Sequence, residues 1–346
     1  MRVYQLFYNN PENSELPFIL FLKPHSKWDF VGIAVRPPTS VILTFLNKGG
    51  LMVFPNAFKY EVPTSVDEAV RLMTEYGYDS KVLAGGQSLL PMMKLRIAAP
   101  AVLIDVNGIQ DLKGWREADG KLRIGALVRH AELEHASELD DKYPLLSRTA
   151  RWIADPPIRN RGTICGSLVH ADPGSDWGAA MIALRAEVEV QGTEGNRLIP
   201  IDEFFVDTFA TSLNENELAV AVHVPTPGGP VAARYMKLER RAGDFAIAAL
   251  AVHIVLDSEG RVAEGGIGIG ACGPIPLRAT KAEEALIGQP ITEETIATVS
   301  RLVPEDADPA DDLRGSAAYK RDLLRVFAAR ALREIAEELH GRVGDE

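Results

Sequence analysis

The chain has 346 residues, with 37 basic and 48 acidic side chains, so its formal net charge is −11. At roughly 100–200 residues per domain, this length predicts two or three domains, each with its own core. The acidic balance argues against nucleic-acid binding, and two cysteines cannot supply a disulfide framework, a zinc ribbon or an iron–sulfur cluster. No uncharged run approaches about 18 residues and no signal peptide is evident, so we expect a soluble protein of the cytoplasmic type.

Residues 1–51 differ from the rest of the chain. Prolines interrupt each short apolar run, as in 17–24, and no helical or alternating period is sustained. A second methionine, Met52, stands just before a much more regular segment. We therefore expect 1–51 to be an N-terminal extension outside the functional fold. The alternative is an arm that orders against a partner.

The segment after Met52 predicts strand–helix–strand units. Ser65 is a suitable N-cap, acidic residues follow it in the first turn, and Gly77 ends the apolar helical period. Buried strands are predicted at 81–84 and 101–106. This order is typical of helices packed on a parallel sheet.

The next segment contains two stretches that alternate between polar and apolar residues. These predict strands at 121–127 and 186–192, the apolar run 218–225 closes the segment, and helices begin near His130 and Tyr143. The sequence Thr-Pro-Gly-Gly-Pro at 226–230 is the strongest linker signal in the chain. It predicts a domain boundary.

Beyond the linker, strands come first and helices follow. The predicted strands are 231–238, 246–256 and 261–270, and the predicted helices are 281–287, 292–303 and 316–340. Segregated strands and helices predict a separate α+β domain.

A glycine-rich turn follows the first predicted buried strand, with the sequence Ala84-Gly85-Gly86-Gln87-Ser88. Adjacent glycines let successive backbone N–H groups approach an anion, as in a phosphate-binding nest. Because the turn matches neither the P-loop nor the G-x-G-x-x-G pattern, an ordinary tight turn is an equally good interpretation.

A second small-residue segment runs from Arg159 to Ser167, in which glycines and hydroxyl side chains alternate. This composition also suits a pyrophosphate, and Asp176 could accept hydrogen bonds from sugar hydroxyls. His170 and Asp172 could be a catalytic pair, but neighbours in one loop seldom touch productively, so a structural loop is favoured. Cys165 has no activating partner in the sequence and is expected to be a buried thiol.

Two further features complete the motifs. Charged residues surround a turn at Ala242-Gly243, between two predicted strands. Residues 268–273 fit G-x-G-x-x-G, but Pro274 and Pro276 follow where a dinucleotide-binding motif would open a helix. We therefore expect 268–273 to be a glycine-rich strand end.

In order and spacing, segments 84–96, 160–173 and 241–246 resemble those of the FAD-binding medium subunit of molybdenum hydroxylases, of the carbon monoxide dehydrogenase and xanthine dehydrogenase type. The resemblance runs from about Met52 to near Leu339. It implies an α+β fold. A two-part FAD-binding domain of the PCMH/vanillyl-alcohol-oxidase type would come first, and a C-terminal domain with a small antiparallel sheet and a helical bundle would follow. The implied boundaries are 1–51 for the extension, 52–227 for the FAD-binding domain (parts about 52–108 and 109–227) and 231–340 for the C-terminal domain.

The resemblance also implies a cofactor site for FAD. The two small-residue turns would hold the pyrophosphate, Ile153 and Ala154 would line the flavin, and Asp176 would bind the polyol or ribose. Lys237 would lie beside the isoalloxazine, where a cation favours reduced, anionic flavin. The implied cofactor-binding residues are Ala84, Gly85, Gly86, Gln87, Ser88, Leu89, Ile153, Ala154, Thr163, Ile164, Cys165, Gly166, Ser167, Asp176 and Lys237.

The function implied by the resemblance is electron transfer within a complex. Hydroxylation would occur at a molybdenum–pterin centre on a large subunit, and [2Fe–2S] clusters on a small subunit would pass electrons to FAD. The flavin would then reduce an external acceptor, and the complex would be a dimer of heterotrimers. No catalytic or metal-binding residue is expected on this chain itself. The alternative is a stand-alone FAD-dependent oxidase or dehydrogenase of the vanillyl-alcohol-oxidase type. The sequence leaves open the hydroxylated substrate, the subunit interfaces and whether the acceptor is oxygen, a quinone or NAD.

Overall fold

The computed structural model describes residues 3–4, 21–22 and 54–343. The chain divides into two units, Met1–Leu51 and Met52–Glu346. In the first unit, β1 (Val3–Tyr4) and β2 (Phe21–Leu22) pair antiparallel. The rest of the predicted extension lies outside the described residues. All that follows concerns the second unit.

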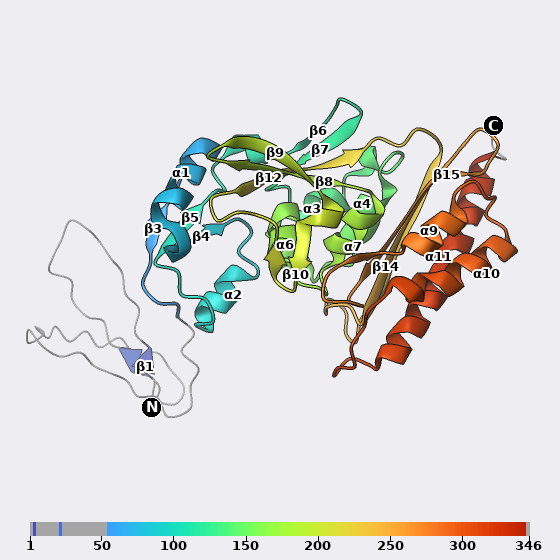
Figure 1. The fold of residues 1–346 in the computed structure, drawn as a ribbon. Helices are drawn as coiled ribbons and strands as arrows, with labels where there is room; N and C mark the ends of the chain where they lie inside the picture. Colours follow the sequence, from blue (N-terminus) through green and yellow to red (C-terminus); the bar gives the residue numbers. More distant parts are fainter. Residues whose placement is uncertain (1–2, 5–20, 23–53, 344–346) are drawn as a thin grey trace, which may run out of the picture. The chain divides into compact units, whose positions relative to one another are not determined.

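The second unit begins with a three-stranded parallel sheet in the order β3–β5–β4 (Figure 1). Helix α1 follows β3, and the Ser65 side chain caps it by accepting a hydrogen bond from the backbone N–H of Glu68. The apolar stripe of α1 is buried, as predicted, and Gly77 with φ +49° ends the helix. The bounds are β3 (Lys59–Glu61), α1 (Val66–Tyr76), a 3₁₀ turn (Gly77–Asp79), β4 (Ser80–Leu83), α2 (Leu89–Lys94) and β5 (Val102–Asp105).

A five-stranded antiparallel sheet forms the second part, in the order β6–β7–β12–β8–β9. Short helices lie between its strands in the sequence. The second small-residue segment runs from the end of α5 into α6, and Asp176 is the first residue of α7. The strands of this sheet are β6 (Trp115–Ala118), β7 (Lys121–Gly125), β8 (Glu187–Gly192), β9 (Gly195–Pro200) and β12 (Leu218–Pro225). A separate antiparallel pair is formed by β10 (Phe205–Asp207) and β11 (Ala210–Thr211). The helices are α3 (His130–Glu134), α4 (Pro144–Ala150), α5 (Pro156–Arg159), α6 (Ile164–His170), α7 (Asp176–Ala183) and α8 (Ile201–Phe204).

The C-terminal part is an antiparallel sheet in the order β13–β14–β15–β16, with α9, α10 and α11 stacked on one face (Figure 1). Its strands are β13 (Val231–Leu238), β14 (Ala248–Leu256), β15 (Val262–Gly270) and β16 (Leu277–Arg278). Its helices are α9 (Thr280–Leu286), α10 (Glu293–Leu302) and α11 (Ala317–Val343). The α+β fold class is confirmed, and the long C-terminal helix extends three residues beyond the predicted end.

The two faces of this C-terminal sheet belong to different hydrophobic cores. On β14, Leu250 and Val252 pack with the C-terminal helices. Ala249 and Ala251 alternate with them and join the core of the two preceding parts of the unit. This period of two is what a strand buried on both faces produces. The first of these cores therefore contains residues from both sides of the 226–230 linker.

The glycines of β15 allow α7 to lie against the sheet backbone. A Cβ at Gly266 would lie 1.8 Å from the Ala183 carbonyl oxygen, and one at Gly268 would lie 1.9 Å from that of Ala179. The G-x-G-x-x-G pattern is therefore the end of a strand that packs under a helix, which confirms the expectation that it opens no dinucleotide-binding helix.

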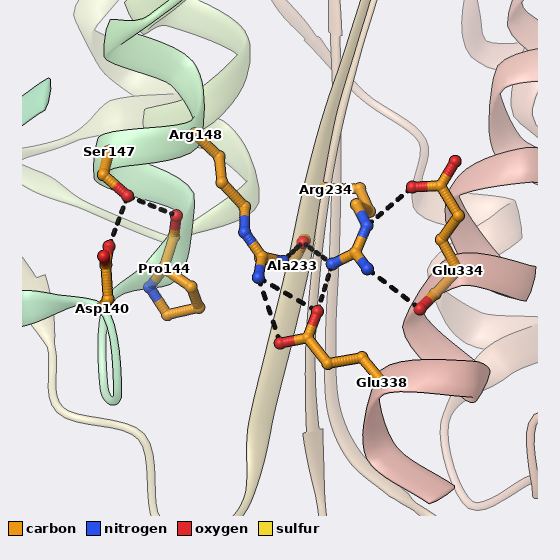
Figure 2. Close-up of polar contacts among 8 residues, drawn as sticks. All are labelled: Asp140, Pro144, Ser147, Arg148, Ala233, Arg234, Glu334 and Glu338. Carbon is orange, nitrogen blue, oxygen red and sulfur yellow. Dashed lines mark hydrogen bonds and ion pairs between the residues drawn. The ribbon is translucent and has the colours of Figure 1, made fainter. Parts of the chain in front are cut away.

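An ionic network joins α4, β13 and α11 (Figure 2). Arg148 donates to the Ala233 carbonyl oxygen and, at 3.1 Å, to Glu338. Arg234 also pairs with Glu338, and its Nε donates to Glu334 at 2.8 Å. Burial raises the pKa of Glu338, but hydrogen bonds from the two arginines outweigh it, and the pKa lies below the usual 4.5.

Candidate cofactor site

The fold brings the two small-residue turns into contact. A Cβ at Gly85 would lie 2.4 Å from the Arg161 carbonyl oxygen and 2.8 Å from the Gly162 Cα. A Cβ at Gly166 would lie 4.0 Å from that of Ala84. Segments separated by about 80 residues in the sequence therefore form one surface of backbone and small side chains.

The first turn presents unused hydrogen-bond donors. Among the described residues, no group accepts a hydrogen bond from the backbone N–H of Gly85, Gly86, Gln87 or Ser88. Gly86 has φ +75°, a conformation that favours glycine. Asn107 fixes the turn from behind, since its Nδ2 donates to the Ala84 carbonyl oxygen at 2.8 Å. A row of unpaired amides beside a glycine suits an anionic group.

The second turn leads into the short helix α6. Thr163 is the N-cap, and its Oγ1 accepts from the Gly166 N–H at 3.2 Å. Ile164 and Cys165 point into the core, so their contribution to a ligand is through the backbone. Burial raises the pKa of the Cys165 thiol to about 12. The expectation of a buried thiol is therefore confirmed.

A buried charge cluster lies where β13 meets α7. The Lys237 ammonium donates to the Trp152 carbonyl oxygen at 2.9 Å and pairs with Asp176 at 3.1 Å and Glu239 at 3.4 Å. The Tyr235 hydroxyl donates to Asp176 at 2.7 Å. Burial raises the pKa of Asp176 despite the nearby ammonium, and burial together with that carboxylate raises the pKa of Tyr235 well above 10. Lys237 thus fixes the backbone that leads to Ala154.

The third motif closes on this backbone. Ala154 has φ +44°, which is uncommon for a residue with a Cβ and typical of functional or strained sites. A Cβ at Gly243 would lie 3.2 Å from the Ala154 carbonyl carbon, so the 240–244 turn packs directly on it. Arg159 donates from the other side to the Ile153 and Ala154 carbonyl oxygens, at 3.0 and 3.2 Å. The second motif therefore contacts the first turn through Arg161 and Gly162, and it contacts through Arg159 the 153–154 backbone on which the third motif packs.

His130 lies between the second turn, at Gly162, and the start of α7, at Trp177. Its Nδ1 accepts from the Trp177 indole N–H at 3.0 Å, and its ring occupies the space that a Cβ at Gly162 would need. Burial, with smaller effects of Arg129 and Arg159, lowers the pKa of His130 to about 3, so the ring is neutral. It links the turn at Gly162 to the start of α7.

Other candidate residues have local roles. Gln87 is exposed and its Nε2 donates to the Gly85 carbonyl oxygen at 3.2 Å, while Leu89 is the first residue of α2. Asp172 accepts from the Gly174 N–H at 2.8 Å, and the His170 ring lies 5.2 Å from that of Phe209. These contacts agree with the interpretation of 170–174 as a structural loop. Among the described residues, no group of three metal-binding side chains is found and no helix is long and apolar enough to cross a membrane.

Sequence reasoning missed four residues at the site: Asn107, Arg129, Tyr235 and Glu239. Asn107, Arg129 and Tyr235 each contact a site residue far away in the sequence, whereas Glu239 contacts Lys237 and accepts from the Gly243 N–H in its own segment. Tyr235 and Glu239 could have been found from Lys237, because residues two apart on a strand share a face. Asn107 and Arg129 could not be found from the sequence in this way.

Two family models match the chain. The FAD binding domain in molybdopterin dehydrogenase matches residues 56–227, and the CO dehydrogenase flavoprotein C-terminal domain matches residues 233–335. The carbon monoxide dehydrogenase medium chain of Hydrogenophaga pseudoflava is 40% identical over 280 residues, covering 81% of this chain and 97% of that protein. The 6-hydroxypseudooxynicotine dehydrogenase complex subunit alpha of Paenarthrobacter nicotinovorans is 37% identical over 286 residues, covering 83% and 96%.

A solved structure agrees with these relatives. Carbon monoxide dehydrogenase from Hydrogenophaga pseudoflava, in a form lacking the molybdenum–pyranopterin moiety, has a chain that is 42% identical with a TM-score of 0.78. The match covers 82% of this chain and 98% of that one. The resemblance seen in the sequence is confirmed, and FAD is the cofactor of this domain. The chain belongs to the family of FAD-binding medium subunits of molybdenum hydroxylases, the oxidoreductase complexes that include the carbon monoxide dehydrogenases.

Proposed function

We propose that this chain is the electron-transfer flavoprotein of a molybdenum hydroxylase, which receives electrons from [2Fe–2S] clusters on a small partner and delivers them to an external acceptor. Substrate hydroxylation would occur on a large molybdenum–pterin partner, in a dimer of heterotrimers. The names of the relatives support this division, because they describe medium chains or subunits of complexes. The chain's two cysteines are too few to bind an iron–sulfur cluster.

The observation that carries the proposal is the contact between the two turns. Among the described residues the amides of 85–88 have no acceptor, Gly85 lies against the backbone of Arg161 and Gly162, and the start of α6 adjoins this contact. These features suit the pyrophosphate of FAD. We assign 84–89 and 163–167 to that group, and Ile153 and Ala154 to the flavin. When bound, FAD supplies the capacity to accept and release electrons; the residues position it and exclude water.

Lys237 would act on the flavin site through the backbone. Its ammonium is directed to the Trp152 carbonyl oxygen and to two carboxylates, so its charge is offset within the protein. We propose that it holds the 152–154 segment in position rather than supplying a free cation. Asp176 already accepts from Tyr235 and Lys237. Its expected contact with the polyol or ribose stays a prediction, as do the cytoplasmic location and the identity of the acceptor.

A stand-alone oxidase is the alternative that the experiment must exclude. The chain would be tagged in its host and purified without dissociation. We expect flavin absorbance near about 370 and 450 nm, together with a small cysteine-rich chain containing iron and a large chain containing molybdenum. The separated chain should not oxidise aldehydes or purines. Turnover of an organic substrate by this chain alone, at roughly 1 per second or more, would overturn the proposal.

A further inference from the structure

Three successive carbonyl groups before α5 accept hydrogen bonds from cationic side chains. Lys237 donates to the Trp152 carbonyl oxygen at 2.9 Å. The Nη1 of Arg159 donates to both of the next two, at 3.0 Å for Ile153 and 3.2 Å for Ala154. One nitrogen reaches two successive carbonyl oxygens because the backbone turns at Ala154, where φ is +44°. Since Arg159 is the last residue of α5, its side chain folds back over its own helix to hold the segment that precedes it.

Glu134 fixes the guanidinium of Arg159 in this position. Its carboxylate oxygens accept from Nε at 2.7 Å and from Nη2 at 3.2 Å, which is the bidentate geometry of a strong pair. The side chains of Arg159 and Glu134 are only 12% and 17% exposed, so water screens the pair weakly. Glu134 is the last residue of α3, a different helix from the one that carries Arg159. The segment before α5 is therefore anchored to α3 through one arginine.

The backbone conformation that Arg159 holds is an unfavourable one. A residue with a Cβ is strained at φ +44°, whereas glycine is not, and such strain persists only where the surroundings fix it. Gly243 packs against Ala154, but its N–H donates to Glu239. Among the residues that the structure describes, Arg159 is the sole hydrogen-bond donor to the carbonyl oxygens of Ile153 and Ala154. It is therefore the side chain best placed to maintain this conformation.

We propose that Arg159 is a positioning residue for the flavin, which acts by holding Ala154 in its left-handed conformation, with Glu134 as its anchor. The inference rests on the proposed function, in which Ile153 and Ala154 line the isoalloxazine. Arg159 needs no contact with FAD for this role. A shift of the 153–154 backbone would change the surroundings of the ring, and the circular dichroism and midpoint potential of the bound flavin would change with them. Lysine cannot replace Arg159, because an ammonium lacks the planar fork that pairs with Glu134 and reaches both carbonyl oxygens at once.

Matched variants of the full chain in its complex separate positioning from general stability. Arg159→Lys keeps the charge and loses the fork, and Glu134→Gln keeps Arg159 and removes its ionic anchor. Arg197→Lys is the control, because Arg197 on the edge strand β9 makes the same kind of pair with Glu217, through Nε and Nη2 at 2.7 Å, and also donates to the Ser212 carbonyl oxygen. FAD is titrated into the stripped complexes. The circular dichroism and midpoint potential of the flavin are then measured at saturating FAD, and thermal unfolding is followed in parallel.

We expect Arg159→Lys to raise the FAD dissociation constant about tenfold, because charge-assisted hydrogen bonds are the stronger class. At saturating FAD, the flavin circular dichroism and midpoint potential of this variant should also differ from wild type. Glu134→Gln should cause a smaller change of the same kind, and Arg197→Lys should change neither. Because glycine adopts φ +44° without strain, adding Ala154→Gly to Arg159→Lys should return both flavin signals toward wild type.

A folded Arg159→Lys complex with wild-type flavin signals would overturn the proposal. The same holds if its melting temperature falls while those signals stay unchanged, since the role of Arg159 would then be structural alone. If Arg159→Lys does not assemble, Glu134→Gln decides by the same criteria. Failure of Ala154→Gly to restore the signals would overturn the role of the left-handed conformation. A wild-type complex that binds no FAD would instead overturn the proposed function.

Discussion

Replacing Gly85 by alanine tests whether the contact between the two turns creates the cofactor site. The added Cβ would lie 2.4 Å from the Arg161 carbonyl oxygen, and ordinary contact begins at 3.4 Å. The two turns must therefore separate by about 1 Å, because the obstructing atoms of Arg161 and Gly162 all belong to the backbone. Overpacking of this kind costs about 1–3 kcal/mol. The strain would be greatest where the two turns bind the cofactor together.

The expected effect is on affinity more than on folding. A loss of about 1–3 kcal/mol corresponds to an FAD dissociation constant higher by roughly 5–150-fold. Titration of the FAD-stripped complex measures it, and thermal unfolding reports stability. Gly108→Ala is a matched control in the same part of the chain, since its Cβ would meet only the Pro63 carbonyl oxygen at 3.9 Å. A folded Gly85→Ala protein with wild-type FAD affinity would show that the turns need not touch and would refute the assignment.

Three further predictions concern stability, the N-terminal segment and the thiols. Glu338→Gln should lower stability at neutral pH by about 1.5–3 kcal/mol, whereas the exposed Glu337→Gln should not. Because the pKa of Glu338 is lowered by folding, its contribution is present above pH 4.5 and lost as the pH falls through the folded value; melting temperatures that did not converge in acid would contradict this. A chain beginning at Met52 should fold and bind FAD with unchanged affinity, and loss of flavin on truncation would show that the segment contributes to the fold. Cys165 and Cys272, with pKa values raised to about 12 by burial, should resist thiol reagents until the protein unfolds, as mass spectrometry would detect.

Local sequence signals predicted most of the helices and strands, but they did not predict the tertiary contacts between them. The N-cap at Ser65 and the alternation at 186–192 are each encoded within a few residues, and both elements lie where they were predicted. The three motifs were also visible, because glycine and small polar residues mark backbone that approaches a ligand.

The residues that join the motifs could not be predicted in the same way. Arg129 meets Asn107 across 22 positions, and Lys237 meets Asp176 across 61. These contacts depend on strand order and helix placement, which the periodicity of one segment does not contain. The expectation that Lys237 lies beside the isoalloxazine stays a prediction, and it carried no information about the Trp152 carbonyl oxygen, Asp176 and Glu239, which the ammonium contacts.

The glycines under α7 restrict how the molecule can move and how it can be re-engineered. Helix α7 belongs by sequence to the FAD-binding segment, yet Gly266 and Gly268 bring it into backbone contact with the C-terminal sheet. The linker at 226–230 therefore cannot serve as a hinge, because rotation of the C-terminal sheet relative to the FAD-binding segment would break the close backbone contacts between α7 and β15. A chimera that takes residues 231–340 from a relative should assemble only if it retains small residues at these two positions. In chimeras between relatives, the FAD-binding segment and the C-terminal segment should therefore be exchanged together.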